Sequence, residues 1–104
     1  MRNMINITLV CAAGMSTSML MSKMKTYATK GGFEVEVKAM PEAKFADYKG
    51  HTDILLLGPQ VSYMIEKMKA AYEPKGIKVA VINMTDYGMM NGEKVLKDSL
   101  ALMN

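Results

Sequence analysis

The sequence has one cysteine, one histidine and no long hydrophobic run, and each of these shortages excludes a class of protein. One cysteine cannot form an internal disulfide or a cysteine-rich metal site, and a free thiol suits a reducing compartment. The longest apolar runs are about five residues, well short of the ~20 that span a bilayer. The first residues also lack the basic start and apolar stretch of a signal peptide. We therefore expect a cytoplasmic protein that does not insert into a membrane.

The charged residues give no sign of a nucleic-acid partner. Lysine and arginine total 13 against 10 acidic residues, for a formal net charge of +3. These charges are scattered along the chain, without a basic run or a stripe of alternating basic and aromatic residues. We therefore expect that the protein does not bind nucleic acid.

Apolar periodicity predicts strands that alternate with helices. Four segments have the β-branched, alternating or continuous apolar character of strands: 5–10, 33–39, 53–57 and 78–82. Four others have helical spacing or a helix-opening proline: 20–30, 41–48, 64–72 and 92–103. The chain has no internal repeat and no low-complexity linker.

This alternation predicts an α/β fold, an open four-stranded parallel sheet with helices on both faces and right-handed crossovers. With 104 residues, half of them apolar, the chain is long enough for one core and too short for two, so we predict a single domain over residues 1–104. Ligands of such open sheets bind beyond the carboxyl ends of the strands. Three predicted loops lie there: 11–18, 58–60 and 83–90.

The first of these loops has the composition of a phosphatase-like phosphate-binding loop. It joins a buried strand to a helix, and it consists of Cys11, Ala12, Ala13, Gly14, Met15, Ser16, Thr17 and Ser18. Small residues let the backbone curl so that successive N–H groups converge on an anion, and the helix dipole adds positive potential. Such a site favours a thiolate and would also bind a phosphoryl group attached to it. The alternative is that Cys11 is a small core residue, as many free cysteines are.

The loop also invites comparison with low-molecular-weight tyrosine phosphatases, whose Cys-x5-Arg loop uses the arginine to clamp the phosphoryl group. In this chain the arginine position is Thr17. Without a bidentate cation, the charge that develops when water attacks phosphorus is less stabilised. The missing arginine favours a phosphocarrier over a phosphatase.

Two segments resemble the IIB component of the sugar phosphotransferase system, in the lactose, cellobiose and chitobiose family. Residues 7–18 (ITLVCAAGMSTS) are similar to the phosphocysteine loop of that family, and residues 54–64 (ILLLGPQVSYM) resemble its second characteristic segment. The length of the chain and the order and spacing of the motifs agree with the family across nearly the whole chain.

The resemblance implies a role in phosphoryl transfer. Cys11 would receive a phosphoryl group from a phosphohistidine of a IIA protein and pass it to sugar bound by the IIC membrane permease. The family resemblance suggests a β-linked disaccharide such as cellobiose, chitobiose or lactose, and it implies no metal or cofactor. Gly58, Pro59, Gln60 and Tyr63 match the second segment and would support the loop or dock a partner; the alternative is a helix-start turn and a packing aromatic.

Asp86, His51 and most methionines are expected to have structural rather than catalytic roles. Asp86 lies in a loop where phosphatases of similar fold keep a general acid, but we favour a turn or capping aspartate. His51 has no second metal ligand at a recognised spacing and is expected to be a solvent-exposed loop residue. Most methionines suit flexible core packing, whereas Met15 and Met19 could belong to an adaptable docking surface.

Three hypotheses therefore stay open. The leading one is a phosphotransferase component that carries phosphate on Cys11. The second is a hydrolase similar to low-molecular-weight cysteine phosphatases, and the third is a non-catalytic anion-binding or protein-binding module in which Cys11 is structural.

Overall fold

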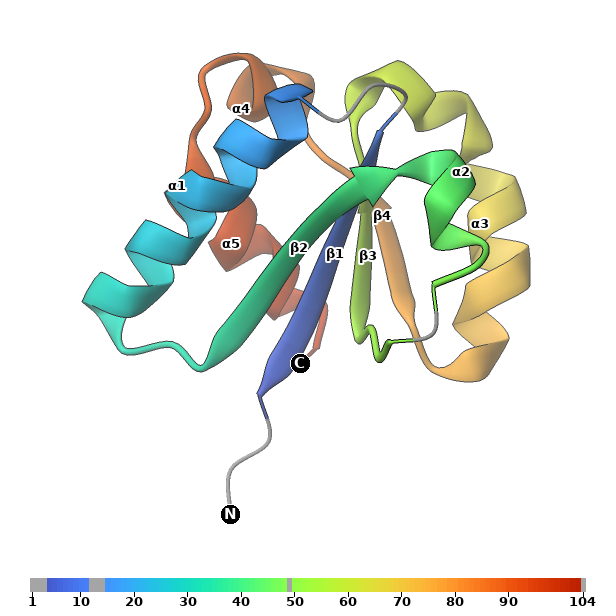
Figure 1. Ribbon diagram of the computed structural model, residues 1–104, viewed down its shortest axis with the longest axis horizontal. Coiled ribbons are helices and arrows are strands. Elements are labelled where there is room, and N and C mark those ends of the chain that lie inside the picture. Colours follow the sequence, from blue (N-terminus) through green and yellow to red (C-terminus); the bar gives the residue numbers. More distant parts are fainter. Residues whose placement is uncertain (1–3, 12–14, 49, 104) are drawn as a thin grey trace.

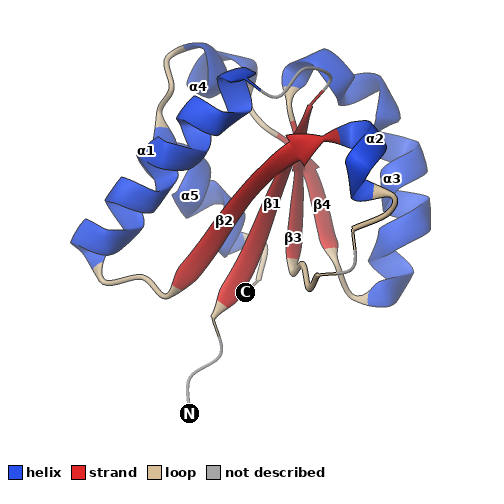
Figure 2. Cartoon of the chain, viewed as in Figure 1, coloured by secondary structure: helices blue, strands red, loops and turns tan. Residues whose placement is uncertain are grey.

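The fold is built around a parallel sheet whose first strand lies inside it. The computed structural model describes residues 4–11, 15–48 and 50–103. The strands are β1 (Ile5–Cys11), β2 (Val35–Pro41), β3 (Ile54–Leu57) and β4 (Lys78–Val81). They pair in parallel in the order β2-β1-β3-β4, as Figure 1 and Figure 2 show. The predicted α/β fold is confirmed.

Helices cover both faces of this sheet. α1, α4 and α5 lie on one face, and α2, η1 and α3 lie on the other (Figure 1). The bounds are α1 (Met15–Gly31), α2 (Glu42–Phe45), η1 (Pro59–Met64), α3 (Ile65–Tyr72), η2 (Glu73–Lys75), α4 (Met84–Gly88) and α5 (Gly92–Ala101). Here η1 and η2 are short 3-10 helices.

The alternation of side chains along the inner strands builds two separate cores. In β3, Ile54 and Leu56 pack under α1 and α5, whereas Leu55 and Leu57 pack under α2, η1 and α3. All four residues of this strand are buried, as expected for a parallel strand that is covered on both faces. A fully buried leucine or isoleucine stabilises the fold by about 1.5–3 kcal/mol. The inner strands are therefore the best-anchored part of the chain.

Close packing of α5 against α1 fixes the helix that follows Cys11. A Cβ atom at Gly92, the first residue of α5, would lie 2.7 Å from the backbone of Lys23 and Met24 in α1. Only glycine allows so close an approach. On the inner side of α1, Leu20, Met24 and Ala28 are buried in the core, as the periodicity predicted.

The structure corrects the sequence prediction at residues 83–90, which we had expected to be a loop. Residues 84–88 form the short helix α4, because the side chain of Asn83 caps it by accepting a hydrogen bond from the backbone N–H of Asp86 at 3.1 Å. A second difference is small: β2 begins at Val35 rather than Phe33, since its pairing with β1 starts at Ile5 opposite Val35. Neither difference changes the topology.

Candidate functional site

Cys11 is the last residue of β1, at the carboxyl end of the sheet. It pairs with Pro41 of β2, whereas the pairing of β1 with β3 ends one residue earlier, at Val10 opposite Leu57. Its side chain is 3% exposed. The chain therefore holds the sulfur at the tip of an inner strand, in the crevice where open parallel sheets bind ligands.

Thr17 is the side chain that the structure brings to the sulfur. It is the third residue of α1 and has no exposed surface. Its Oγ1 atom lies 3.1 Å from Sγ of Cys11, and the two atoms share a buried hydrogen bond. The residue at the position of the phosphatase arginine thus contacts the sulfur itself.

Gly58 borders Cys11 from the neighbouring strand. Its backbone N–H donates to the carbonyl of Val10 at 2.8 Å, which extends the β1–β3 pairing by one step. A Cβ atom at residue 58 would lie 3.3 Å from Cβ of Cys11 and 3.0 Å from Oε1 of Gln60. Gly58 therefore leaves room for the cysteine, and the side chain of Gln60 turns back over it.

The other predicted residues of the second segment differ in position. Pro59 opens η1, where its missing N–H costs nothing. Tyr63 is 80% exposed, so it does not pack in the core as an anchoring aromatic would. This leaves its ring available to a partner.

Part of the predicted phosphate loop lies outside the described residues. This applies to Ala12, Ala13 and Gly14. The prediction of a loop over 11–18 is wrong for its last four residues, because α1 begins at Met15; Ser18 is exposed on this helix. The site as described therefore consists of Cys11, Thr17 and the Gly58 turn.

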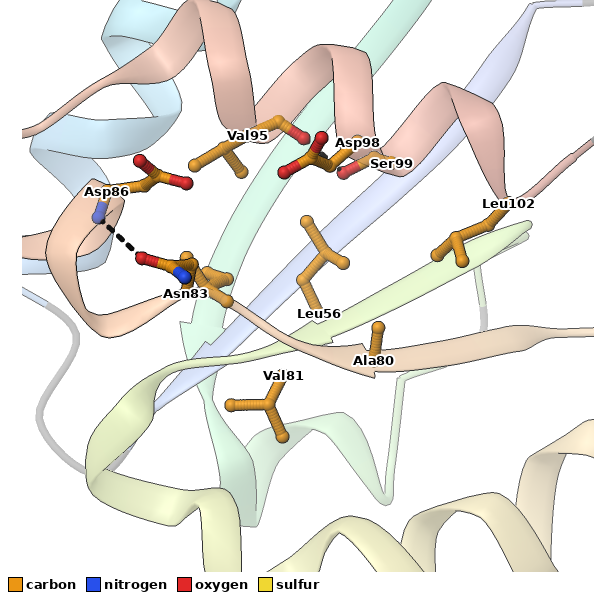
Figure 3. Close-up of a pocket in the computed structure, with 10 residues that line it drawn as sticks. Leu56, Ala80, Val81, Asn83, Asp86, Val95, Asp98, Ser99 and Leu102 are labelled. Atoms are coloured by element: carbon orange, nitrogen blue, oxygen red, sulfur yellow. Dashed lines mark hydrogen bonds between the residues drawn. The ribbon is translucent and has the colours of Figure 1, made fainter.

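The Asp86 side chain contacts a lysine of α5. Its Oδ2 atom lies 3.3 Å from Nζ of Lys94, which also contacts Asp98 at 2.9 Å. The hydrogen bonds to Asp98 and then to Asp86 raise the pKa of the Lys94 ammonium. Figure 3 shows Asp86 and Asp98 beside an open pocket of about 250 Å³ between β4 and α5. We favoured a turn or capping role for Asp86, but Asn83 caps α4, and the Asp86 side chain contacts Lys94 instead.

His51 lies before β3, at the amino end of the sheet. Its side chain is exposed, and its Nε2 atom lies 2.7 Å from Oδ1 of Asp53. Within residues 4–11, 15–48 and 50–103, no three His, Cys, Asp or Glu side chains lie close enough to hold a metal ion together.

Three elements, α1, η1 and α4, reach the carboxyl end of the sheet (Figure 1), and four strongly exposed apolar residues belong to them or directly follow them. We call them the apolar rim: Met19, Tyr63, Met84 and Met89. Each of these four residues is at least 60% exposed. Sequence analysis had singled out Met19 and Tyr63 but not Met84 and Met89, because their exposure depends on the unpredicted helix α4.

None of the helices in the described parts of the chain has both the length and the apolar content needed to cross a membrane.

Comparison with known proteins agrees with this geometry. The family model for the PTS system, Lactose/Cellobiose specific IIB subunit, matches residues 6–98. The galactose-specific EIIB component of Lactococcus lactis subsp. cremoris is 45% identical over 103 residues, covering 94% of this chain and 95% of the relative. The cellobiose-specific EIIB component of Lactococcus lactis subsp. lactis has the same identity and coverage.

A solved structure shows the same fold. The solution structure of the cellobiose-specific phosphotransferase IIB component from Borrelia burgdorferi superposes with a TM-score of 0.78 at 37% identity, covering 98% of this chain and 94% of the other. The chain therefore belongs to the lactose/cellobiose-specific IIB subunits of the PTS, which are phosphotransferase components of sugar transport.

Proposed function

We propose that the protein is a phosphocarrier that accepts a phosphoryl group on Cys11 from a phosphohistidine of a IIA protein and transfers it to a sugar bound by a IIC permease. The observation that supports this most is the position of the sulfur. It ends an inner strand, it shares a hydrogen bond with the hydroxyl of Thr17, and it borders the Gly58 turn. A nucleophile needs such a fixed position to attack in line.

The proposed cycle consists of two displacements at phosphorus. In the first, Sγ of Cys11 forms the S–P bond, the N–P bond of phosphohistidine breaks with its electron pair returning to the imidazole, and the thiol proton ends on that nitrogen. In the second, a sugar hydroxyl oxygen forms the new P–O bond, the S–P electron pair returns to sulfur, and the hydroxyl proton is released. The amino end of α1, which begins at Met15, supplies positive potential for the phosphoryl oxygens in both steps.

Two features favour a carrier over a hydrolase. Threonine at position 17 cannot provide the bidentate cation that stabilises phosphoryl transfer to water. The carboxylate of Asp86 is paired with Lys94, so it is not poised as a general acid toward a leaving group. Both features protect a phosphocysteine from hydrolysis while it waits for its acceptor.

The partners would dock on the apolar rim. Met19, Tyr63, Met84 and Met89 are exposed and belong to or directly follow α1, η1 and α4, which lie around the carboxyl end of the sheet (Figure 1), and methionine side chains adapt to differently shaped surfaces. A carrier must meet a donor and an acceptor with one surface, so adaptable contacts suit it. A cytoplasmic location follows, because both partners would present their reacting groups there.

The sugar is proposed only as a class. The two Lactococcus relatives are equally similar to this chain, yet one is named for galactose and the other for cellobiose. The contacts that discriminate between sugars therefore belong to the permease, and a β-linked disaccharide such as cellobiose, chitobiose or lactose is the class that we propose.

The test is transfer from phosphorylated IIA to the purified protein, followed by mass spectrometry. We expect the mass of one phosphoryl group to be added to wild type and none to Cys11→Ser. A serine variant that accepts phosphate as fast as wild type would contradict the proposal.

A second measurement separates the carrier from the hydrolase. Wild type alone should turn over p-nitrophenyl phosphate no faster than Cys11→Ser does. Steady turnover that depends on Cys11 would instead favour the phosphatase-like alternative.

A further inference from the structure

We propose that Thr17 is a positioning residue for Cys11, and that its buried hydroxyl donates a hydrogen bond that favours the thiolate form of the sulfur. In this role Thr17 sets how readily the sulfur gives up a phosphoryl group. This effect on phosphoryl release rests on the proposed carrier function. The hydrogen bond and its effect on the thiol do not.

The geometry fixes the direction of this hydrogen bond once the thiol has ionised. Oγ1 of Thr17 lies 3.1 Å from Sγ of Cys11, and both side chains are buried. A thiol and a hydroxyl can each donate or accept, but a thiolate can only accept. Ionisation of Cys11 therefore leaves the Thr17 hydroxyl as the donor in this pair.

Burial makes the contact matter more than it would at the surface. Hydrogen bonds to a charged group are stronger than those between neutral groups, and a low local dielectric strengthens them further. Thr17 has no exposed surface and Cys11 only 3%. Ionisation of the sulfur should therefore strengthen its hydrogen bond with the Thr17 hydroxyl, and loss of this hydroxyl should disfavour ionisation.

A hydrogen-bond donor to the thiolate affects the sulfur differently as a nucleophile and as a leaving group. It raises the thiolate fraction at neutral pH, but it lowers the intrinsic nucleophilicity of that thiolate. It also makes the sulfur a better leaving group, because the S–P electron pair returns to an atom that the hydroxyl stabilises. An arginine at position 17 would bind the phosphoryl oxygens, whereas the threonine acts on sulfur and so assists release to a sugar.

The structure offers a matched control for the loss of this hydroxyl. Thr8 and Thr52 form a second buried pair, with 2.8 Å between their Oγ1 atoms, and it contains no ionisable partner. Thr52→Val removes a buried hydroxyl that has one hydroxyl neighbour, as Thr17→Val removes one that neighbours the thiol. The two variants should lose stability to a similar extent and differ in the reactivity of Cys11.

The experiment measures the rate at which Cys11 reacts with hydroxyethyl disulfide between pH 6 and pH 11 in wild type, Thr17→Val, Thr17→Ser and Thr52→Val. For a tenfold loss of thiolate stabilisation and a Brønsted coefficient of about 0.45, Thr17→Val should react about threefold more slowly than wild type at neutral pH and about threefold faster at full ionisation. The two pH profiles should therefore cross. Thr17→Ser and Thr52→Val should follow the wild-type profile.

The crossing separates a specific hydrogen bond from simple loosening of the fold. A loosened site would expose the sulfur and raise the rate at every pH. Uniformly faster reaction of Thr17→Val, an unchanged profile, or a Thr17→Ser variant that behaves like Thr17→Val would each overturn the proposal.

A measurement on wild type covers the case in which Thr17→Val does not fold. The Thr17 hydroxyl proton should be visible by NMR as slowly exchanging, and its resonance should move as Cys11 ionises. A hydroxyl proton that exchanges fast, or that is unaffected by pH, would reject the hydrogen bond. Neither measurement involves phosphate, so each can fail or succeed independently of transfer from IIA.

Discussion

The two ends of the sheet use similar polar contacts for different purposes. At the amino end, Asp53 accepts a hydrogen bond from the backbone N–H of Asn6 at 2.8 Å and contacts His51, which ties β3 to β1. At the carboxyl end, the hydroxyl of Thr17 contacts the sulfur of Cys11. The first arrangement joins strands, whereas the second contacts the single thiol of the chain.

The surroundings of the two ends differ as well. The open pocket at the amino end combines Glu36, His51 and Asp53 with apolar residues, which are Met4, Ile5 and Met103. The carboxyl end carries the apolar rim of exposed methionines and Tyr63. We therefore expect variants at the amino end to alter stability and leave phosphoryl transfer intact, and variants that contact Cys11 at the carboxyl end to alter phosphoryl transfer.

The largest effect is expected for Gly58→Ala, at the carboxyl end. The added methyl group would lie 3.3 Å from Cβ of Cys11 and would push the sulfur by a few tenths of an ångström. Because in-line attack depends on position, we expect the rate of phosphate acceptance from IIA to fall about tenfold. The rate is measured with phosphorylated IIA in excess.

Gly88→Ala is the matched control. Gly88 ends α4 at the same end of the sheet, and a Cβ atom there would meet nothing within 4 Å. It should leave the transfer rate unchanged. Equal rates for Gly58→Ala and wild type would show that the close approach of residue 58 has no bearing on the sulfur.

A moderate effect on stability is expected for Asp53→Asn, at the amino end. Burial alone raises the pKa of the Asp53 carboxyl, but hydrogen bonds from Asn6 and His51 outweigh burial and hold this pKa below its ordinary value. A carboxyl with a lowered folded-state pKa adds stability above its unfolded pKa of about 3.9, and this is lost as pH falls through the folded value. We expect Asp53→Asn to lower the free energy of unfolding by about 1 kcal/mol at pH 7.

Urea unfolding at several pH values checks this expectation. The gap between wild type and Asp53→Asn should begin to close as the pH falls below about 4, and it should vanish below the lowered pKa of folded Asp53, where both side chains are neutral. Phosphate acceptance at pH 7 should be unaffected. If the difference in unfolding free energy persists in acid, or if Asp53→Asn loses phosphate acceptance, the amino end of the sheet does not act through stability alone.

The smallest effect is expected for Asp86→Asn. Because the Asp86 carboxylate pairs with Lys94, which is itself largely exposed, its loss should cost less than about 1 kcal/mol of stability. The rate of phosphate acceptance should stay within about twofold of wild type, since general acid–base catalysis would be worth at least a hundredfold. A hundredfold loss of phosphate acceptance in Asp86→Asn would instead indicate that Asp86 is catalytic.

The sheet could be predicted from sequence because its signals are local. The continuous apolar run at 54–57 and the β-branched run at 5–10 allow few alternatives, and the carboxyl ends of parallel strands must meet at one edge. The proximity of Cys11 and Gly58 follows from that rule. The helix α4 was missed because five residues are too few to show a period, although Asn83 followed by Asp86 is a capping signal that could have revealed it.

The direction of side chains could not be predicted in the same way. The sequence placed Thr17 within a phosphate-binding loop, but only the orientation of the first turn of α1 decides that its hydroxyl meets the sulfur. Likewise, the exposure of Tyr63 depends on how η1 turns after Pro59. Both depend on tertiary packing, which a pattern of residue types does not encode.

The place of β1 inside the sheet has a consequence for the nascent chain. The ribosome makes β1 first, yet its two neighbours, β2 and β3, are made later, and the turn that borders the cysteine ends at Gln60. The strands and the turn that bury the thiol in the folded chain are therefore all synthesised after it. Until then the nascent chain lacks the contacts that bury its single cysteine in the native fold.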